Sequence, residues 1–327
     1  MKCYKIYNAT ELWQKETSLP SVATFSQSFD NMLGNDGVKL GNITELLGLP
    51  GAGKTQLCLQ LCASVQIPKD LGGLDAEALY IDTNTNFTLH RFREILSASL
   101  MQCQKVLNTT LQVTEDEALK KLHYVNAFGL ENYCSLMYNL PKFIAEHPQV
   151  RLIAIDSITH PFKEGISTKQ RTGLLFRQMA DLQRIAIQNQ IAIVLTNEMS
   201  TRVGLSGGAV VGALGDAWAH RCNARVLLSA ADDAREGWHR LALLLKSNVA
   251  ANTVAKFQER VIRMELNTDS SVPHCPSPAL ARDSASALAT PSSTPWFSSR
   301  LAMQRDTHSL LKWPDVSPFR SDSKLLP

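Results

Sequence analysis

Short apolar runs alternate along most of the chain with longer segments in which apolar residues recur at helical spacing. The short runs are rich in Val, Ile and Leu and predict strands at residues 42–47, 78–82, 123–126, 151–156 and 191–197. The longer segments predict helices at residues 54–65, 89–104, 132–146 and 170–189, the third of them strained by Pro141. Strands that alternate with helices in this way predict a parallel sheet covered by helices.

Three further apolar runs follow, at residues 224–228, 241–245 and 254–264, without a long helical segment between them. Closely spaced strands of this kind favour antiparallel pairing, so we expect all three to extend one side of the sheet as antiparallel strands. The predicted fold class is therefore α/β, with a mostly parallel twisted sheet, flanking helices and added antiparallel strands.

The composition changes near Thr268. The last 60 residues hold 13 serines and 8 of the 14 prolines, with no glycine and no isoleucine. Segments of this composition bury too little apolar surface to fold, which predicts disorder. We divide the chain into an N-terminal segment (1–23), an α/β core (24–267) and a disordered Ser/Pro-rich tail (268–327).

Charge and cysteine usage narrow the function only slightly. Lys and Arg number 33 against 30 Asp and Glu, so any polyanion binding must come from local patches. No stretch approaches the roughly 18 apolar residues of a bilayer span, which predicts no membrane association. The seven cysteines are scattered without C-x-x-C spacing, and the first ten residues lack an apolar targeting core, so we expect reduced thiols in the cytosol or nucleus.

The segment from Gly48 to Thr55 matches G-x-x-x-x-G-K-[ST] and lies between a predicted strand and a predicted helix. Its glycines let successive N–H groups face a phosphate, and the following helix adds a positive end. Lys54 should bridge the β and γ phosphates, and the Thr55 hydroxyl suits Mg²⁺. The predicted nucleotide-binding residues are Gly48, Gly51, Ala52, Gly53, Lys54, Thr55 and Gln56.

An apolar strand that ends in Asp156 follows the phosphate loop by about a hundred residues. Such a strand-end carboxylate can hold Mg²⁺ through its water shell. The motif is common by itself, but together with the phosphate loop it implies ATP or GTP with Mg²⁺. We therefore predict Thr55 and Asp156 as the metal residues, and Lys54 and Asp156 as the catalytic ones.

Longer phrases of the sequence resemble the RecA-type recombinases. They are TFSQSFDNMLGNDGVKLGNITELLGLPGAGKTQLC at 24–58, IPKDLGG, ALYIDTN, IVLTNEM and ALGDAWAH, in the order of that family. The chain most resembles the eukaryotic strand-exchange paralogues, and among them the C-type, spindle-D-like group. The resemblance implies a RecA-like P-loop ATPase core that binds ATP and Mg²⁺ through Lys54, Thr55 and Asp156.

Two positions depart from the family pattern. Asn84 stands where the family has a Glu that polarises the attacking water, and general-base help is worth about 10² to 10⁴ in rate. Slow hydrolysis is expected unless Glu45 or Asp82 compensates. Glu198 stands where the family has a Gln that senses the γ-phosphate. It can turn away, pair with a cation, take a raised pKa, or be a solvated strand-end residue.

The resemblance also implies DNA and protein contacts. Two loops, about 162–169 and 200–211, correspond to the DNA-gripping loops of the family. The first offers Lys163 and Lys169 and is followed by Arg171, and the second offers Arg202. The alternative is a pair of ordinary solvated loops. Residues 4–11 resemble the linker that adds a strand to a neighbouring protomer, with Ile6 and Ala9 at its anchor positions, although a frayed terminus fits too. His220 corresponds to a histidine near the neighbour's nucleotide, or is a core histidine.

These observations predict a recombinase paralogue in homologous recombination repair of DNA double-strand breaks, including meiotic ones. We expect it to bind single- and double-stranded DNA and to form a hetero-oligomer with other paralogues and the strand-exchange recombinase. We expect weak DNA-dependent ATPase activity and a nuclear location with a cytoplasmic pool. Two alternatives stay open, a catalytically inert scaffold and another P-loop NTPase or kinase.

Overall fold

The computed structural model describes residues 6–34, 37–107, 114–163, 165–201, 210–230 and 239–258. The predicted tail at 268–327 and Arg202 lie outside these residues. Within them, no helix combines the length and apolar character that crossing a membrane requires.

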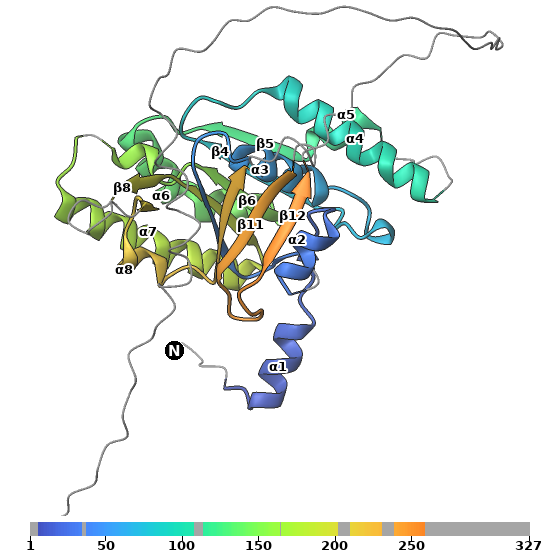
Figure 1. Cartoon of the computed structure of the whole chain (residues 1–327), viewed down its shortest axis with the longest axis horizontal. Helices are drawn as coiled ribbons and strands as arrows, with labels where there is room; N and C mark the ends of the chain where they lie inside the picture. The colour runs from blue at the N-terminus through green and yellow to red at the C-terminus, as the bar shows by residue number, and fades with distance from the viewer. Residues whose placement is uncertain are drawn as a thin grey trace, which may run out of the picture. The chain divides into compact units, whose positions relative to one another are not determined.

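One eight-stranded sheet forms the centre of the fold (Figure 1). In spatial order its strands are β12 (Val254–Gln258), β11 (His239–Lys246), β10 (Ala224–Ala230), β3 (Ile43–Gly48), β7 (Ala192–Asn197), β6 (Val150–Asp156), β4 (Glu77–Asp82) and β5 (Leu122–Asn126). The six strands from β10 to β5 pair in parallel, and β11 and β12 are antiparallel. The predicted α/β class with a mostly parallel sheet and added antiparallel strands is confirmed.

One detail of that prediction was wrong, because β10 pairs in parallel with β3 and not antiparallel. The connection from β7 to β10 spans residues 198–223 and contains only one short helix, α8 (Asp216–Ala219), in its described part. A parallel crossover needs a dozen or more residues but not a long helix. The connection is long enough for β10 to enter from the same side as β3.

Helices cover both faces of the sheet (Figure 1). One core packs α2 (Gln27–Met32), α3 (Lys54–Ser64) and α4 (Leu89–Leu107) on one face. The other core packs α6 (Leu130–Glu146) and α7 (Thr168–Asn189) on the opposite face. The remaining helices are α1 (Ala9–Thr17), η1 (Lys69–Leu71), α5 (Glu115–Lys120) and η2 (His160–Phe162). Two short antiparallel pairs lie outside the main sheet: β1 (Ser21–Val22) with β2 (Val38–Lys39), and β8 (Met199–Thr201) with β9 (Val210–Gly212).

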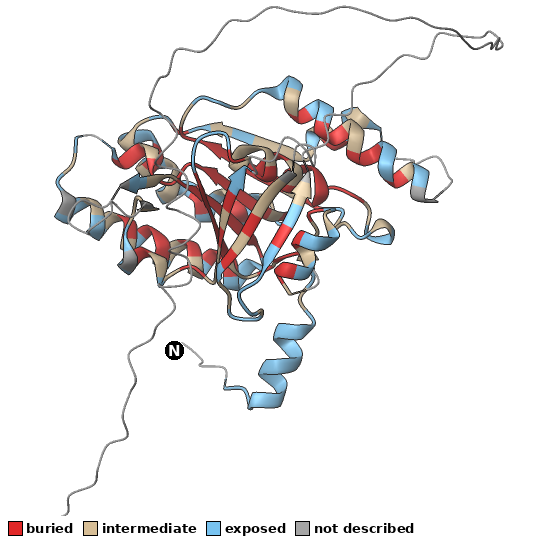
Figure 2. Ribbon diagram, in the orientation of Figure 1, coloured by how far each residue is buried: buried red, intermediate tan, exposed pale blue. Residues whose placement is uncertain are grey.

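Strand β4 explains why the central runs are continuously apolar. Ala78 and Tyr80 belong to the core under α3 and α4, whereas Leu79 and Ile81 belong to the core under α6. Successive strand side chains point to opposite faces, and both faces are covered here. Figure 2 shows the resulting buried centre, flanked by helices with exposed outer sides.

The N-terminal segment differs from the expected extended linker. Helix α1 begins at Ala9, because the Asn8 side chain accepts from the Glu11 N–H at 2.8 Å while the Glu11 carboxylate accepts from the Asn8 N–H. This capping box fixes the helix start within the segment 4–11. Ile6 precedes the helix and is exposed, and none of the residues of α1 is buried.

Candidate functional site

The predicted phosphate loop joins β3 to α3 at the carboxyl edge of the sheet. Gly48 has a φ of 156°, and a Cβ there would lie 2.6 Å from the Leu228 carbonyl oxygen and 2.9 Å from the Ala52 Cβ. Gly53 adopts the left-handed conformation and is the N-cap residue of α3. The loop is therefore held against β10, and the positive end of α3 faces the space above it.

Lys54 folds back over this loop. Its Nζ donates to the carbonyl oxygens of Gly48 at 2.8 Å and Leu49 at 3.1 Å. Burial lowers the pKa of Lys54, and the nearby carboxylates of Asp156 and Glu198 oppose that shift. A bound phosphate would add further negative charge beside this partly desolvated ammonium.

Asp156 collects three hydroxyl donors at the end of β6. Thr55 Oγ1 donates to Oδ2 at 2.6 Å, the Tyr80 hydroxyl donates to Oδ2 at 2.9 Å, and Thr196 Oγ1 donates to Oδ1 at 2.5 Å. Burial, followed by the Asp156 charge, raises the pKa of Tyr80, so Tyr80 remains a protonated donor. The two predicted metal residues thus touch, and their oxygen atoms fit the ligand preference of Mg²⁺.

A cavity of about 430 Å³ lies at the phosphate loop beside Lys54 and Thr55. Two arginines that the sequence did not point to also line it. Arg91, in the first turns of α4, donates from Nε to Gln56 Oε1 at 2.6 Å. Arg240, on β11, donates to the Gly51 carbonyl. The position of Arg91 just after β4 was a usable signal, because strand-end loops meet at this edge. Arg240 carried no such signal, because β11 is one of the added antiparallel strands.

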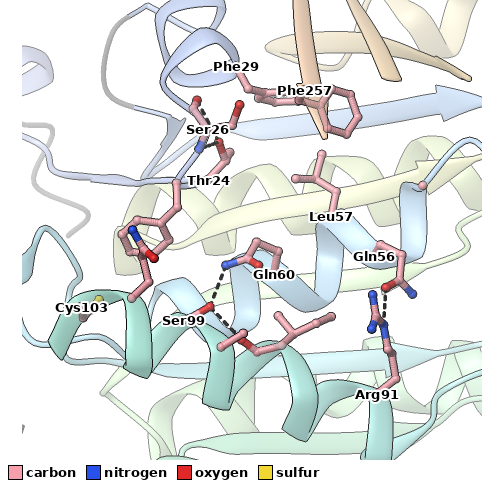
Figure 3. Close-up of a pocket in the computed structure, with 15 residues that line it drawn as sticks. Thr24, Ser26, Phe29, Gln56, Leu57, Gln60, Arg91, Ser99, Cys103 and Phe257 are labelled. Atoms are coloured by element: carbon pink, nitrogen blue, oxygen red, sulfur yellow. Dashed lines mark hydrogen bonds between the residues drawn. The ribbon is translucent and has the colours of Figure 1, made fainter. Parts of the chain in front are cut away.

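A second cavity, of about 480 Å³, continues from Gln56 and Arg91 between α3 and α4 (Figure 3). Figure 3 shows Arg91 and Gln56 turned toward one another, and Gln60 of α3 bonded to Ser99 of α4 at 3.1 Å. Its volume lies within the range of small-molecule sites. The cavity therefore has room for the part of a ligand that extends beyond its phosphates.

Neither carboxylate considered as a replacement base is free. Asp82 is buried and accepts from the N–H groups of Asn84 and Phe87, each at 2.9 Å, so it caps the turn that leads to α4. Glu45 is fully buried, and its donors are Asn197 Nδ2 at 2.6 Å, Trp218 Nε1 at 2.8 Å and Arg225 Nε. The Asn84 side-chain oxygen is buried and has no hydrogen-bond partner among the described residues.

Glu198 pairs with a cation, which is one of the possibilities considered for this residue. Its carboxylate lies 2.9 Å from Lys163 Nζ, and both side chains are partly exposed. An exposed pair of this kind stabilises the fold by about 1 kcal/mol or less. Its main effect is to join the end of β7 to the segment that precedes α7.

The other predicted DNA and interface residues are dispersed. Lys169 and Arg171 lie in the first turn of α7, with Lys169 exposed and Arg171 partly buried. His220 is exposed, which excludes the core-histidine alternative, and its carbonyl accepts from Lys246 Nζ at 2.9 Å. The nearby Trp218 is a core residue.

The strand order, the glycine loop ahead of α3 and the Thr55–Asp156 contact define a P-loop protein with a RecA-like core. The sequence model of the Rad51 family matches residues 15–259, and the chain belongs to this family.

Known proteins support the same assignment. The chain is 33% identical over 264 residues to the DNA repair protein RAD51 homolog 3 of Cricetulus griseus, covering 78% of this chain and 70% of that protein. It is 33% identical over 217 residues to the protein of the same name from Dictyostelium discoideum, covering 64% and 57% of the two chains. It is 30% identical over 211 residues to the DNA repair and recombination protein RadA of Metallosphaera sedula, covering 63% and 61%. The predicted likeness to RecA-type recombinase paralogues of the C type is confirmed.

Proposed function

We propose that this chain is an ATP-binding recombinase paralogue that acts in homologous recombination repair of DNA. The observation that carries the proposal is the contact of Thr55 with Asp156 beside the Lys54 ammonium. The names of the similar proteins refer to DNA repair and recombination. Family membership and the intact phosphate site support the same role here.

ATP and Mg²⁺ fit the residues present. The N–H groups ahead of α3 and Lys54 would hold the phosphates, and the cavity of Figure 3, next to Gln56 and Arg91, has room for the nucleoside. Thr55 and Asp156 would hold the metal. When bound, Mg²⁺ neutralises charge on the β and γ phosphates.

We infer that hydrolysis is slow. Asn84 cannot accept a proton from the attacking water, and the donors bonded to Asp82 and Glu45 occupy the carboxylates that were the obvious replacements. Loss of general-base help costs about 10² to 10⁴ in rate. Nucleotide occupancy then acts more as an assembly signal than as a source of turnover.

DNA, single- or double-stranded, is proposed to contact the two loops at about 162–169 and 200–211 together with the start of α7. Lys163, Lys169, Arg171 and Arg202 supply the charge, and Lys163 is shared with Glu198. Each neutralised phosphate adds about 0.7 to the log–log salt slope on single strands, so four cations predict modest, salt-sensitive binding.

Modest DNA affinity suggests that the chain works within a complex. We propose that it forms a hetero-oligomer with other paralogues and the strand-exchange recombinase. This complex would act in the nucleus, with a cytoplasmic pool, and its substrates would include meiotic breaks. Its contacts include Ile6, the start of α1 at Ala9, and His220, which are all exposed.

The direct test is ATP binding by the Lys54→Ala chain, with Lys169→Ala as the matched control. We expect Lys54→Ala to lose most of its ATP affinity, because the ammonium lies at the phosphate loop, and Lys169→Ala to keep it. Equal ATP affinity of the wild type and Lys54→Ala would show that this loop is not the phosphate-binding site.

The occupied carboxylates also favour a second candidate, an inert scaffold that keeps the fold for assembly alone. A chain that pulls down paralogues but shows neither ATP binding nor salt-dependent binding to single strands would establish that alternative.

A further inference from the structure

Three potential metal ligands converge at the amino edge of the sheet, away from the phosphate loop. They are Glu77, the first residue of β4, His123 of β5, and His147, which follows α6. The opposite end of β4 is Asp82, five strand steps or about 16 Å away. This cluster is therefore separate from the nucleotide site.

The fold explains why these residues meet. Glu77 and Leu79 share a face of β4, because strand side chains alternate, and His123 is the β5 partner of Leu79. Glu77 and His123 are thus diagonal neighbours on the face that α6 covers. His147 caps α6, with its N–H bonded to the Phe143 carbonyl at 2.9 Å, which places its ring at the same edge.

The three ligand atoms lie within 4.8 Å of one another, which is close enough to surround a small cation. His123 Nε2 is hydrogen-bonded to Glu77 Oε2 at 2.8 Å, and His147 Nδ1 lies 3.8 Å from the same oxygen. The second distance is too long for a hydrogen bond. In a tetrahedral zinc site with bonds of about 2.0–2.2 Å, ligand atoms lie roughly 3.3 Å apart. The two observed distances lie on either side of this value.

The surroundings orient the ligands and leave access for an ion. The Phe143 ring contacts the His123 ring edge-on, with centroids 5.4 Å apart, and the His147 ring at 4.4 Å. The three ligand side chains are 25–37% exposed. An ion can enter from solvent, while Phe143 limits how far the rings can turn.

We propose that Glu77, His123 and His147 form a site for a divalent transition metal of the Zn²⁺ class, with a fourth position open to water. Two imidazoles and one carboxylate are a common zinc ligand set. Bound metal would join edge strand β5 to β4 and to the end of α6.

Visible absorption spectroscopy with Co²⁺, made on the chelator-treated full-length chain, tests the site. Co²⁺ can occupy zinc sites and, unlike Zn²⁺, absorbs visible light. The titration is made with saturating Mg²⁺, which occupies oxygen-rich sites. We expect one equivalent of Co²⁺ with tetrahedral bands that Zn²⁺ abolishes. Loss of one ligand in His147→Gln or His123→Gln should weaken binding by about tenfold or more.

His90→Gln is the matched control, because His90 pairs with Glu94 on the exposed side of α4, outside the cluster. It should leave the cobalt spectrum and affinity unchanged, and circular dichroism checks that each variant is folded. Three outcomes would overturn the proposal. They are no cobalt band displaceable by Zn²⁺, equal affinity in folded His147→Gln and wild type, and a thiolate-to-cobalt band that assigns the metal to cysteines.

Discussion

Replacement of Glu45 by Gln tests whether this buried carboxylate supports the fold or serves as the missing base. Glu45 is fully buried, and its strongest partner is Arg225, whose side chain is only 17% exposed. The Gln side chain has nearly the same volume, but it removes the negative charge and turns one acceptor into a donor. Arg225 would keep a desolvated charge without its partner.

The expected cost follows from that geometry. Removal of one member of a buried ion pair destabilises a protein by about 3–5 kcal/mol, which is a large part of a typical 5–15 kcal/mol stability. Urea unfolding of the full-length chain measures it. Glu94→Gln is the control, because Glu94 forms exposed pairs with His90 and Arg91, and its loss should leave the urea midpoint almost unchanged.

The double variant Glu45→Gln with Arg225→Met separates lost charge pairing from lost packing. Because it removes both charges, it should recover part of the stability lost by Glu45→Gln alone. A Glu45→Gln protein that unfolds within 1 kcal/mol of wild type while its ATP turnover collapses would refute this reasoning. Glu45 would then be the base and not a structural residue.

Three further predictions concern the nucleotide site. Asn84→Glu should raise ATP turnover, by up to about 10² if the new carboxylate reaches the attacking water, and unchanged turnover would contradict the slow-hydrolysis argument. Bound phosphate favours the charged form of Lys54, whose pKa is lowered in the chain without nucleotide. ATP affinity should therefore be constant below that pKa and fall as the pH rises through it. Lys54→Arg should abolish the fall, because an arginine keeps its charge. Gly48→Ala should destabilise the fold by about 1–3 kcal/mol and weaken ATP binding, because its Cβ meets the Leu228 carbonyl. Gly173→Ala is the control: Gly173 is exposed within α7 with nothing within 4 Å, so urea unfolding should show a gain of about 0.5–1 kcal/mol from helix propensity.

Local pattern was sufficient for much of the fold. The strands around the phosphate loop and the helices between them were predicted to within a few residues, because apolar periodicity is set by neighbours along the chain. Helix α1 was missed although its signal, the Asn8–Glu11 capping box, is equally local. The parallel pairing of β10 was missed for a different reason, since strand direction depends on where a long connection returns.

Within the candidate site, features formed by residues close together in the sequence could be predicted, and features formed by residues far apart could not. The glycines, Lys54 and Thr55 lie in one short motif, and the end of an apolar strand marks Asp156, so the sequence alone was enough to predict their roles. Only the tertiary structure decided that Glu45 belongs to Arg225, 180 residues away, and that Glu198 pairs with Lys163. The convergence of Glu77 with His123 and His147 likewise depends on strand register and helix placement. Side chains from separate elements meet only when the sheet is assembled, and no local spacing records which of them will become neighbours.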